Sequence, residues 1–596
     1  MGSLAAILVQ DGDPDRGQVG QMLSASPHRG SLKDVVVRGR CALGVSNEEG
    51  WADATVAVDD GMVAAFAGTL DNLAEVARKV DPVDGSGAST TPASLVIKAF
   101  RAFGDKAPAL FRGVFAGVVS DGERAWCFRD HLAFGQVFYR QGPRALYAAT
   151  EPKQVVAGAA IPLEPDVDVV ERLFWTDVGD ETPCALKGVQ RIPKAAVLTS
   201  NGESARLSRF WDPEAVFETA RHSPDEIQER FDELMDQAVA RTLTGNDVIS
   251  LSGGIDSPAV AAYAAPRYLE LSGKPIAALS TVYPQFPAVD ERKYIEIVCD
   301  HLGMPLHVYE PQARPLDNLM HWVKLCDGPV PVLPPGEAEE HYSRARALGY
   351  RTMLLGDLAE FLIDRRAKLI PHLLRERRWS ALWRQIQAQR GEGVSRRTVA
   401  RQLGSTYVPK PLLLALDRRH TSWGQVTFPD WLELSVIQEV NYRRWWRHPR
   451  DRWQAEQLAF FVGPGIGPEA DAICAAVCGI RARSPWMDVD LTEFFLSLPA
   501  EVKFPDYARK SLVRRLLRGK VPNPILERRD KTFFNDWIMD NIDYPTLRKL
   551  LINPSHRIKG VNYDVLGEHL NREDLAMAEF KWAFDLAKCH AFLSLW

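Results

Sequence analysis

The sequence has little cysteine, and its cysteines form no recognisable site. Eight cysteines are spread over 596 residues without a Cys-x-x-Cys pair, which excludes a disulfide framework and a zinc ribbon. The thirteen histidines form no H-E-x-x-H motif, so no zinc protease site is predicted. No hydrophobic run approaches the roughly 18 residues of a membrane span, and the N-terminus lacks a charged signal-peptide start. We therefore expect a cytoplasmic protein with no membrane partner.

The chain as a whole also lacks a basic bias. Its 72 Lys and Arg face 77 Asp and Glu, a net charge of −5, so no nucleic-acid partner is expected. One segment departs from this balance, because residues 364–419 hold fourteen Lys and Arg against four acids, which leaves −15 for the rest. Three interpretations stay open for this segment: a solvated helical face, a binding surface for an anionic or extended polymeric substrate, and, least favoured because few aromatic residues interleave the charges, a nucleic-acid surface.

The order of apolar segments predicts the domain organisation. A chain of 596 residues exceeds what one core supports, so at least two domains are expected. Residues 1–210 contain short β-rich runs separated by Gly, Asp and Pro, which predicts an α+β layered-sheet domain. In residues 211–596, strands first alternate with helices, which predicts an α/β parallel sheet, and the chain after residue 360 is predicted to be helical almost to its end. A basic helical insertion is expected at about 364–450.

The most informative motif is a glycine-rich loop between an apolar strand and a helix. The glycines allow close backbone approach to a ligand, and the hydroxyls and helix-start N–H groups favour an anion. No Walker lysine is present, and the acid within the turn points to a metal instead. The loop consists of Leu251, Ser252, Gly253, Gly254, Ile255, Asp256 and Ser257.

This S-G-G-x-D-S loop resembles the pyrophosphatase loop of the asparagine-synthetase-like amidotransferases. Further segments resemble the same family: R-S-P-W-M-D at 483–488, S-L-P at 497–499, Lys510 with Leu512 and Arg514, and E-R-R-D-K-T-F at 527–533. The resemblance implies a pyrophosphatase-loop ATP-binding domain. It also implies that this domain cleaves ATP between the α and β phosphates and activates a carboxylate as an acyl-adenylate.

The resemblance also assigns roles to single residues. Where the family shows G-x-G-x-D, this chain reads Gly356-Asp357-Leu358-Ala359-Glu360. Gly356 is thereby implied to contact ATP, Asp357 to lie near the reacting amine, and Glu360 to bind Mg²⁺ together with Asp256. Lys531 is implied beside the α-phosphate. Leu358 in place of Gly, and Glu360 in place of Asp, depart from the pattern, and helix-cap acids are the structural alternative.

The N-terminal segment resembles the family's glutaminase domain, which has an Ntn-hydrolase fold. That domain opens M-C-G-I-A-G-I, whereas this chain has Gly2 at the position of the nucleophilic cysteine and Ser3 one position late. The N-G-E that holds glutamine reads Ala67-Gly68-Thr69. A nucleophile without its thiol cannot act, so we predict a degenerate glutaminase-like domain.

Members of the family without glutaminase chemistry include β-lactam synthetases and lasso peptide cyclases. The length and the Arg-rich insertion resemble the lasso peptide cyclases more. This implies an ATP-dependent macrolactam synthetase that joins an Asp or Glu side chain of a linear core peptide to its N-terminal amine. The implied partners are that peptide, a leader-peptide-recognition protein and a leader peptidase. The alternatives are a β-lactam-type or ammonia-using ligase for a small acid, and a non-catalytic nucleotide-binding protein.

Overall fold

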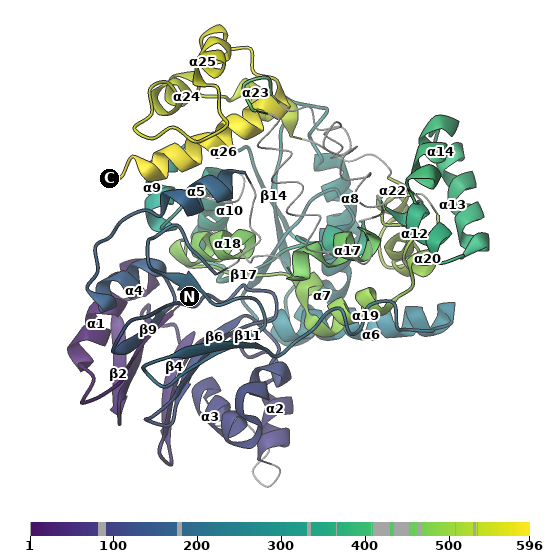
Figure 1. Ribbon diagram of the computed structural model, residues 1–596. Helices are drawn as coiled ribbons and strands as arrows, with labels where there is room; N and C mark the ends of the chain where they lie inside the picture. Colours follow the sequence, from purple (N-terminus) through teal and green to yellow (C-terminus); the bar gives the residue numbers. More distant parts are fainter. Residues whose placement is uncertain are drawn as a thin grey trace.

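Two antiparallel sheets and one parallel sheet form the framework of the protein (Figure 1). The computed structural model describes residues 2–81, 91–175, 182–329, 335–364, 366, 368–406, 408, 429–433, 452–462, 466–506, 508–528, 532 and 534–596. Both antiparallel sheets lie in the first 209 residues, and the parallel sheet uses strands from 247 to 483. The predicted fold class is confirmed.

The two antiparallel sheets pack face to face between helices. Alternation along the first strand shows why: Leu4, Ala6 and Leu8 enter the core between the sheets, whereas Ala5 and Ile7 face the helices α1 and α4. One sheet contains β1 (Ser3–Val9), β2 (Leu32–Arg38), β3 (Cys41–Asn47), β8 (Phe138–Gln141), β9 (Ala145–Ala149) and β10 (Gln190–Arg191). The other contains β4 (Ala54–Asp59), β5 (Met62–Gly68), β6 (Phe115–Ser120), β7 (Ala125–Arg129), β11 (Ala196–Ser200) and β12 (Ala205–Arg209). The helices are α1 (Arg16–Ser24), α2 (Leu73–Val80), α3 (Pro92–Phe103), α4 (Pro152–Ala159) and α5 (Val167–Phe174).

The parallel sheet has the strand order β15-β14-β13-β16-β17. Its strands are β13 (Asp247–Ser250), β14 (Ala277–Thr281), β15 (Leu306–Tyr309), β16 (Thr352–Leu354) and β17 (Arg481–Arg483), and the helices α6 (Pro224–Thr242), α7 (Asp256–Ser272), α8 (Arg292–Leu302) and α10 (Pro335–Ala347) precede or connect the first four. The sequence prediction was wrong about β17, which was expected to be helical. This strand has only three residues, and its first and last residues are arginines, so it has no hydrophobic periodicity of its own. Its parallel pairing with β16 defines it.

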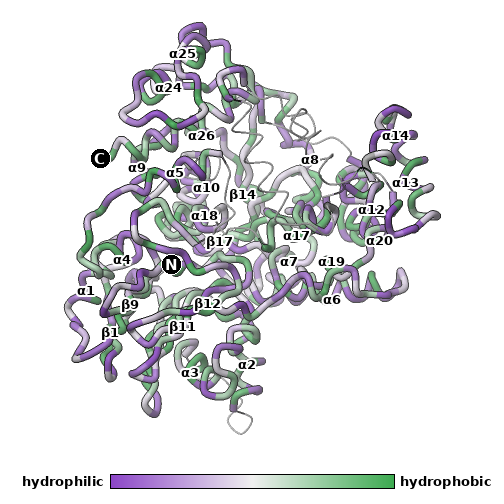
Figure 2. The backbone as a smooth tube through the Cα atoms, viewed as in Figure 1, coloured by the Kyte–Doolittle hydropathy of each residue, from purple (hydrophilic) through white to green (hydrophobic). Residues whose placement is uncertain are grey.

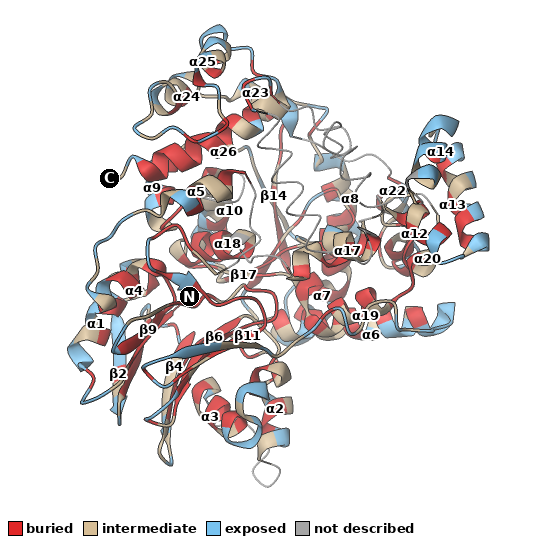
Figure 3. Ribbon diagram, viewed as in Figure 1, coloured by how far each residue is buried: buried red, intermediate tan, exposed pale blue. Residues whose placement is uncertain are grey.

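The rest of the C-terminal half is helical. The long helix α26 is buried along most of its length and contacts α5 and α9 (Figure 3), and α18 is strongly hydrophobic (Figure 2). Within the described residues, no helix combines the length and apolar character needed to span a membrane. These helices are α9 (Leu319–Leu325), α11 (Ala359–Ile363), α12 (Leu369–Arg375), α13 (Trp379–Gly391), α14 (Arg396–Ser405), α17 (Arg452–Val462), α18 (Ile466–Val477), α19 (Val489–Ser497), α20 (Ala500–Lys503), α21 (Ser511–Leu516), α22 (Asn523–Glu527), α23 (Asn535–Asp540), α24 (Tyr544–Leu551), α25 (Tyr563–Arg572) and α26 (Met577–Leu593).

The basic insertion expected at about 364–450 contains three helices in the described residues, whereas residues 429–433 form a turn and an isolated bridge from Leu432 to Val561. Helices α12, α13 and α14 occupy residues 369–405 and project from the side of the molecule (Figure 1). Residues 365, 367, 407, 409–428 and 434–450 of the expected insertion lie outside the described residues.

Buried ion pairs join the antiparallel sheets to the C-terminal half. Glu469 of α18 accepts hydrogen bonds from Arg129 at 2.8 Å and from Arg191 at 2.7 Å, and all three side chains are buried. Arg481 and Arg483 at the ends of β17 reach Asp53 and Asp71 in the same way. Charges removed from water need such partners, so these pairs fix how the two halves meet.

We expect Glu469→Ala to destabilise the protein by about 3–5 kcal/mol, because it leaves two buried guanidinium groups without their carboxylate. A denaturant titration followed by intrinsic fluorescence measures this loss. The matched control is Glu164→Ala, which removes an exposed pair with Lys187 at 3.8 Å and should cost less than about 1 kcal/mol. Equal losses in the two variants would contradict the role given to Glu469.

Candidate active site

The strand order places the candidate site at a topological switch point. From β13 the chain adds β14 and then β15 on one side, whereas β16 and β17 lie on the other. Ligands of open parallel sheets bind where the connections diverge, beyond the carboxyl ends of the strands. The loop after β13 carries residues 251–255, and the loop after β16 carries Gly356 and Asp357. The two segments that the sequence singled out therefore meet at this edge.

The loop after β13 is held open by its own serines. The Ser252 N–H donates to Ser257 Oγ at 2.9 Å, and the two hydroxyl oxygens lie 3.0 Å apart. Leu251 and Ile255 point into the core, so only their backbone can face a ligand. The helix α7 begins at Asp256, so its first N–H groups lie at the loop.

The loop after β16 packs directly against the start of α7. A Cβ added to Gly356 would lie 2.7 Å from Ser257 Cα, a contact that real Cβ atoms do not make. Glycine is therefore required at 356 for the two loops to touch. The next residues depart from helical geometry, since Leu358 adopts φ 71° immediately before α11. Asp357 and Glu360 are exposed on this turn.

Asp256 has one carboxylate oxygen in use and one without a partner among the described residues. Lys510 pairs with Oδ2, and the buried Oδ1 has no hydrogen bond. Burial raises the Asp256 pKa, the Lys510 ammonium lowers it, and the charges of Glu360 and Asp364 raise it further. Two neighbouring acids and a free carboxylate oxygen are a donor set that suits Mg²⁺, with nucleotide oxygens completing the shell.

The R-S-P-W-M-D segment supports both loops from behind. The Trp486 indole N–H donates to the Asp256 carbonyl at 3.0 Å, and the Ser484 hydroxyl donates to the Asp357 carbonyl at 2.8 Å. Asp488 caps α19 and pairs with Arg241 at 2.8 Å. The motif therefore orients the site with two uncharged side chains, which hold the backbone carbonyls of the two loops.

Asp357 lies among acids that change its proton affinity. Although its side chain reaches solvent, the surrounding protein desolvates it and, with the charges of Asp471, Glu360 and Asp256, raises its pKa to about 7. Asp471 on α18 is buried among protein and accepts a hydrogen bond from Tyr342 at 2.8 Å. The sequence did not reveal Asp471, because it lies 114 positions from Asp357 in a helix that reads as apolar core.

A second cluster holds the glycine loop from the other side. Glu291 accepts from the Gly253 N–H at 2.9 Å and pairs with Arg528 at 2.8 Å, and Arg528 also donates to the Gly253 carbonyl. Glu291 immediately precedes α8, but its side chain makes no helix-cap bond. Lys531, the predicted cation at the α-phosphate, lies outside the described residues.

Comparison with known proteins agrees with this geometry. A profile described as asparagine synthase matches residues 230–594, and one described as a glutamine amidotransferase domain matches residues 1–211. The chain belongs to the asparagine synthase family. Asparagine synthetase (glutamine-hydrolyzing) 3 of Bacillus subtilis (strain 168) is 27% identical over 210 residues, which are 33% of this chain and 34% of that relative. The alignment thus spans about a third of the relative's length.

Comparison with solved structures gives two matches with TM-scores of 0.27 and 0.26. The first is glutamine phosphoribosylpyrophosphate amidotransferase from B. subtilis complexed with ADP and GMP, at 10% identity over 59% of this chain and 81% of that chain. The second is described as the allosteric regulatory enzyme of purine biosynthesis, at 12% identity over 63% and 78%.

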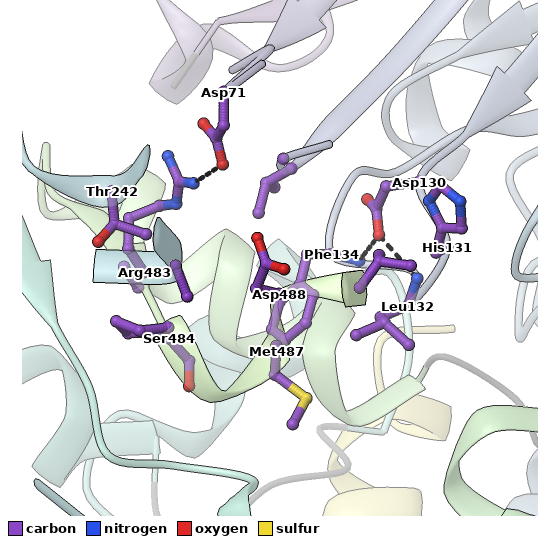
Figure 4. Close-up of a pocket in the computed structure, with 16 residues that line it drawn as sticks. Asp71, Asp130, His131, Leu132, Phe134, Thr242, Arg483, Ser484, Met487 and Asp488 are labelled. Atoms are coloured by element: carbon purple, nitrogen blue, oxygen red, sulfur yellow. Dashed lines mark hydrogen bonds and ion pairs between the residues drawn. The ribbon is translucent and has the colours of Figure 1, made fainter. Parts of the chain in front are cut away.

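The N-terminal domain of this family member has no room for a nucleophile at position 2. A Cβ on Gly2 would lie 2.8 Å from both Ala54 Cβ and Asn47 Oδ1. Thr69, at the position of the family's glutamine-holding acid, instead accepts from Arg483 at 2.9 Å. The nearby cavity between the two halves is about 40 Å³ and is lined by Asp130, His131 and Asp488 (Figure 4). It is too small for a nucleotide.

We expect Gly2→Cys to lower the melting temperature and not to create glutaminase activity, because the added side chain has no space. Thermal unfolding and glutamate release from glutamine measure the two effects. Gly20→Cys is the control for an added thiol, since nothing lies within 4 Å of a Cβ there. Glutamate release by the Gly2→Cys variant alone would overturn the assignment.

Proposed function

We propose that this protein is an ATP-dependent, AMP-forming ligase that activates a carboxylate and joins it to an amine. The observation that carries this proposal is the junction at the switch point, where one Asp256 carboxylate oxygen has no hydrogen-bond partner among the described residues and lies beside the Gly356–Glu360 turn. A glycine loop, a helix start and paired acids form a site for a nucleotide with its metal. Membership in the asparagine synthase family agrees with this chemistry.

We further propose that the bond formed is an intramolecular amide in a peptide. The closed position 2 argues that glutamine does not supply the amine. The projecting helices α12–α14 provide surface for a substrate larger than an amino acid. A linear core peptide with a free N-terminal amine and an internal Asp or Glu meets both conditions. The leader-peptide-recognition protein and leader peptidase implied by the resemblance are proposed partners.

The proposed reaction has two steps. A carboxylate oxygen of the substrate bonds to the α-phosphorus of ATP. The bond between the α-phosphorus and the oxygen that bridges the α and β phosphates breaks, and pyrophosphate leaves. The amine nitrogen then bonds to the acyl carbon, AMP leaves, and Asp357 takes the proton. Holding both ends of one peptide makes the second step effectively unimolecular. Mg²⁺ held by Asp256 and Glu360 would neutralise phosphate charge, and Lys531 is proposed to support pyrophosphate departure.

The decisive experiment incubates the protein with ATP, Mg²⁺ and such a linear peptide, and measures nucleotide products and peptide mass together. We expect AMP, pyrophosphate and a peptide lighter by one water. Asp256→Asn should slow AMP formation by about a hundredfold or more, because the metal loses a ligand. Asp236→Asn is the matched control on α6, where the acid pairs only with Arg267.

The outcomes separate the parts of the proposal. AMP formation without loss of water would remove the macrolactam assignment and leave a ligase for another acid. An unchanged rate in Asp256→Asn would remove the metal assignment. Nucleotide binding without AMP formation, across a panel of peptides and small acids, would leave a non-catalytic nucleotide-binding protein.

The amide-forming rate should rise with pH through the pKa of Asp357, since only the ionised carboxylate accepts a proton. Asp471→Asn removes one of the negative charges that raise this pKa. The pKa of Asp357 should then fall, and the rising limb of the pH–rate profile should move to lower pH. Single-turnover rates from pH 5 to 9 measure the shift. A profile that moves to higher pH would contradict this role for Asp471.

A further inference from the structure

Helix α13 is firmly attached to the protein on one side. Its buried residues Ala381 and Leu382 join a small core with Leu373, Trp453 and Phe504. Just before α13, Arg378 pairs with Glu218 at 2.8 Å and with Glu501 at 2.6 Å. The opposite side of α13 is therefore presented to solvent in a fixed orientation.

That outer side carries two large exposed aromatic side chains. Trp379 and Trp383 are 59% and 63% exposed, and one helical turn separates them. Gln387 and Arg390 continue the same stripe, and we call these four residues the α13 face. Tryptophan and arginine are enriched in protein interfaces and dominate their binding energy. Two adjacent indoles left in water on an anchored helix indicate a binding surface.

The charge around the α13 face is strongly positive. Residues 366–406 contain ten Arg and Lys against two Glu, and α13 and α14 are largely exposed (Figure 3). Within the described part of the chain, six of these arginines form no ion pair: Arg377, Arg384, Arg390, Arg396, Arg397 and Arg401. The remaining residues of the protein carry a net charge of −13. The surface therefore complements an acidic ligand.

A basic groove continues from this surface toward the nucleotide site. It has a volume of about 610 Å³, and its lining includes Arg366, Glu392, Arg509, Arg515 and Arg518. Glu392 lies at the C-terminal end of α13, and Arg509 precedes Lys510, the partner of Asp256. The hydroxyl of Ser511, which also lines the groove, is buried without a hydrogen-bond partner in the described residues. The groove is thus lined by the end of α13 and by the residue next to Lys510.

We propose that the α13 face and this groove bind an acidic segment of a polypeptide substrate, away from the residues that react. The indoles would anchor its apolar side chains, and the arginines would pair with its carboxylates. A polypeptide fits better than a nucleic acid, because Glu392, Asp506 and Glu527 also line the groove. A peptide can place uncharged residues beside these acids and its carboxylates beside the arginines, whereas a nucleic acid carries a phosphate at every nucleotide. This inference rests on the proposed function for the identity of the ligand as substrate.

The test measures binding without ATP, so it does not depend on catalysis. The probe is a fluorescein-labelled peptide of repeated Glu-Glu-Leu triplets, titrated by fluorescence anisotropy. We expect saturable, salt-sensitive binding that weakens about tenfold or more in the double variant Trp379→Ala, Trp383→Ala. The double variant Leu269→Ala, Leu271→Ala is the control, because it removes exposed apolar side chains, 52% and 58% exposed, from α7.

Three results would overturn the inference: no binding of the probe, equal binding by the tryptophan variant, or tighter tryptophan-dependent binding of oligo-dT or of phosphatidylglycerol–phosphatidylcholine vesicles. With an active peptide substrate carrying an acidic segment, the tryptophan variant should raise KM and leave kcat unchanged. Loss of AMP formation in the wild type would count against the proposed function alone, whereas AMP formation with an unchanged KM in the tryptophan variant would count against this inference alone.

Discussion

The close contact between Gly356 and Ser257 sets the geometry of the whole site. Because residue 356 has no side chain, the loop after β16 can lie against the first turn of α7. Glu360 then comes close enough for its charge to raise the pKa of both Asp256 and Asp357. A parallel sheet brings the two loops to one edge, but only the glycine lets them touch. Burial and the neighbouring acids raise the pKa of Asp357 to about 7, which suits the base role proposed for it.

The second constraint is the charged interface between the two halves. Arg481 and Arg483 are the end residues of β17, and both form ion pairs with acids of the N-terminal domain. The same segment continues to Trp486, which fixes the Asp256 backbone. A domain that has lost the space for its nucleophile is thus still connected to the nucleotide loop through one short strand. This connection gives a physical reason for the chain to keep the domain.

Much of the fold followed from local pattern. Short β-rich apolar runs between turn residues predicted the layered sheets, and alternating strands and helices predicted the parallel sheet, because both patterns reflect which segments are buried. The strand β17 was not predicted, because three residues of which two are arginines have no such pattern. Pairing with β16 alone defines it as a strand. Of the site, the motif residues Asp256 and Asp357 were identifiable. Asp471 was not identifiable, because its effect depends on a contact between distant segments. Arg528 lies in a segment that the resemblance had identified, but its bonds to Glu291 and Gly253 are decided by the fold.

The sequence by itself determined the chemistry that is possible: a glycine loop for phosphate, acids for a metal and a base, no thiol at position 2, and a basic insertion. These properties belong to residue types and their spacing. The tertiary structure decided which groups share a site, which carboxylate oxygen is left unpaired and which tryptophans remain in water. Those outcomes depend on burial and on distances across the fold, because an isolated residue's proton affinity and exposure are set by neighbours that the sequence does not place next to it.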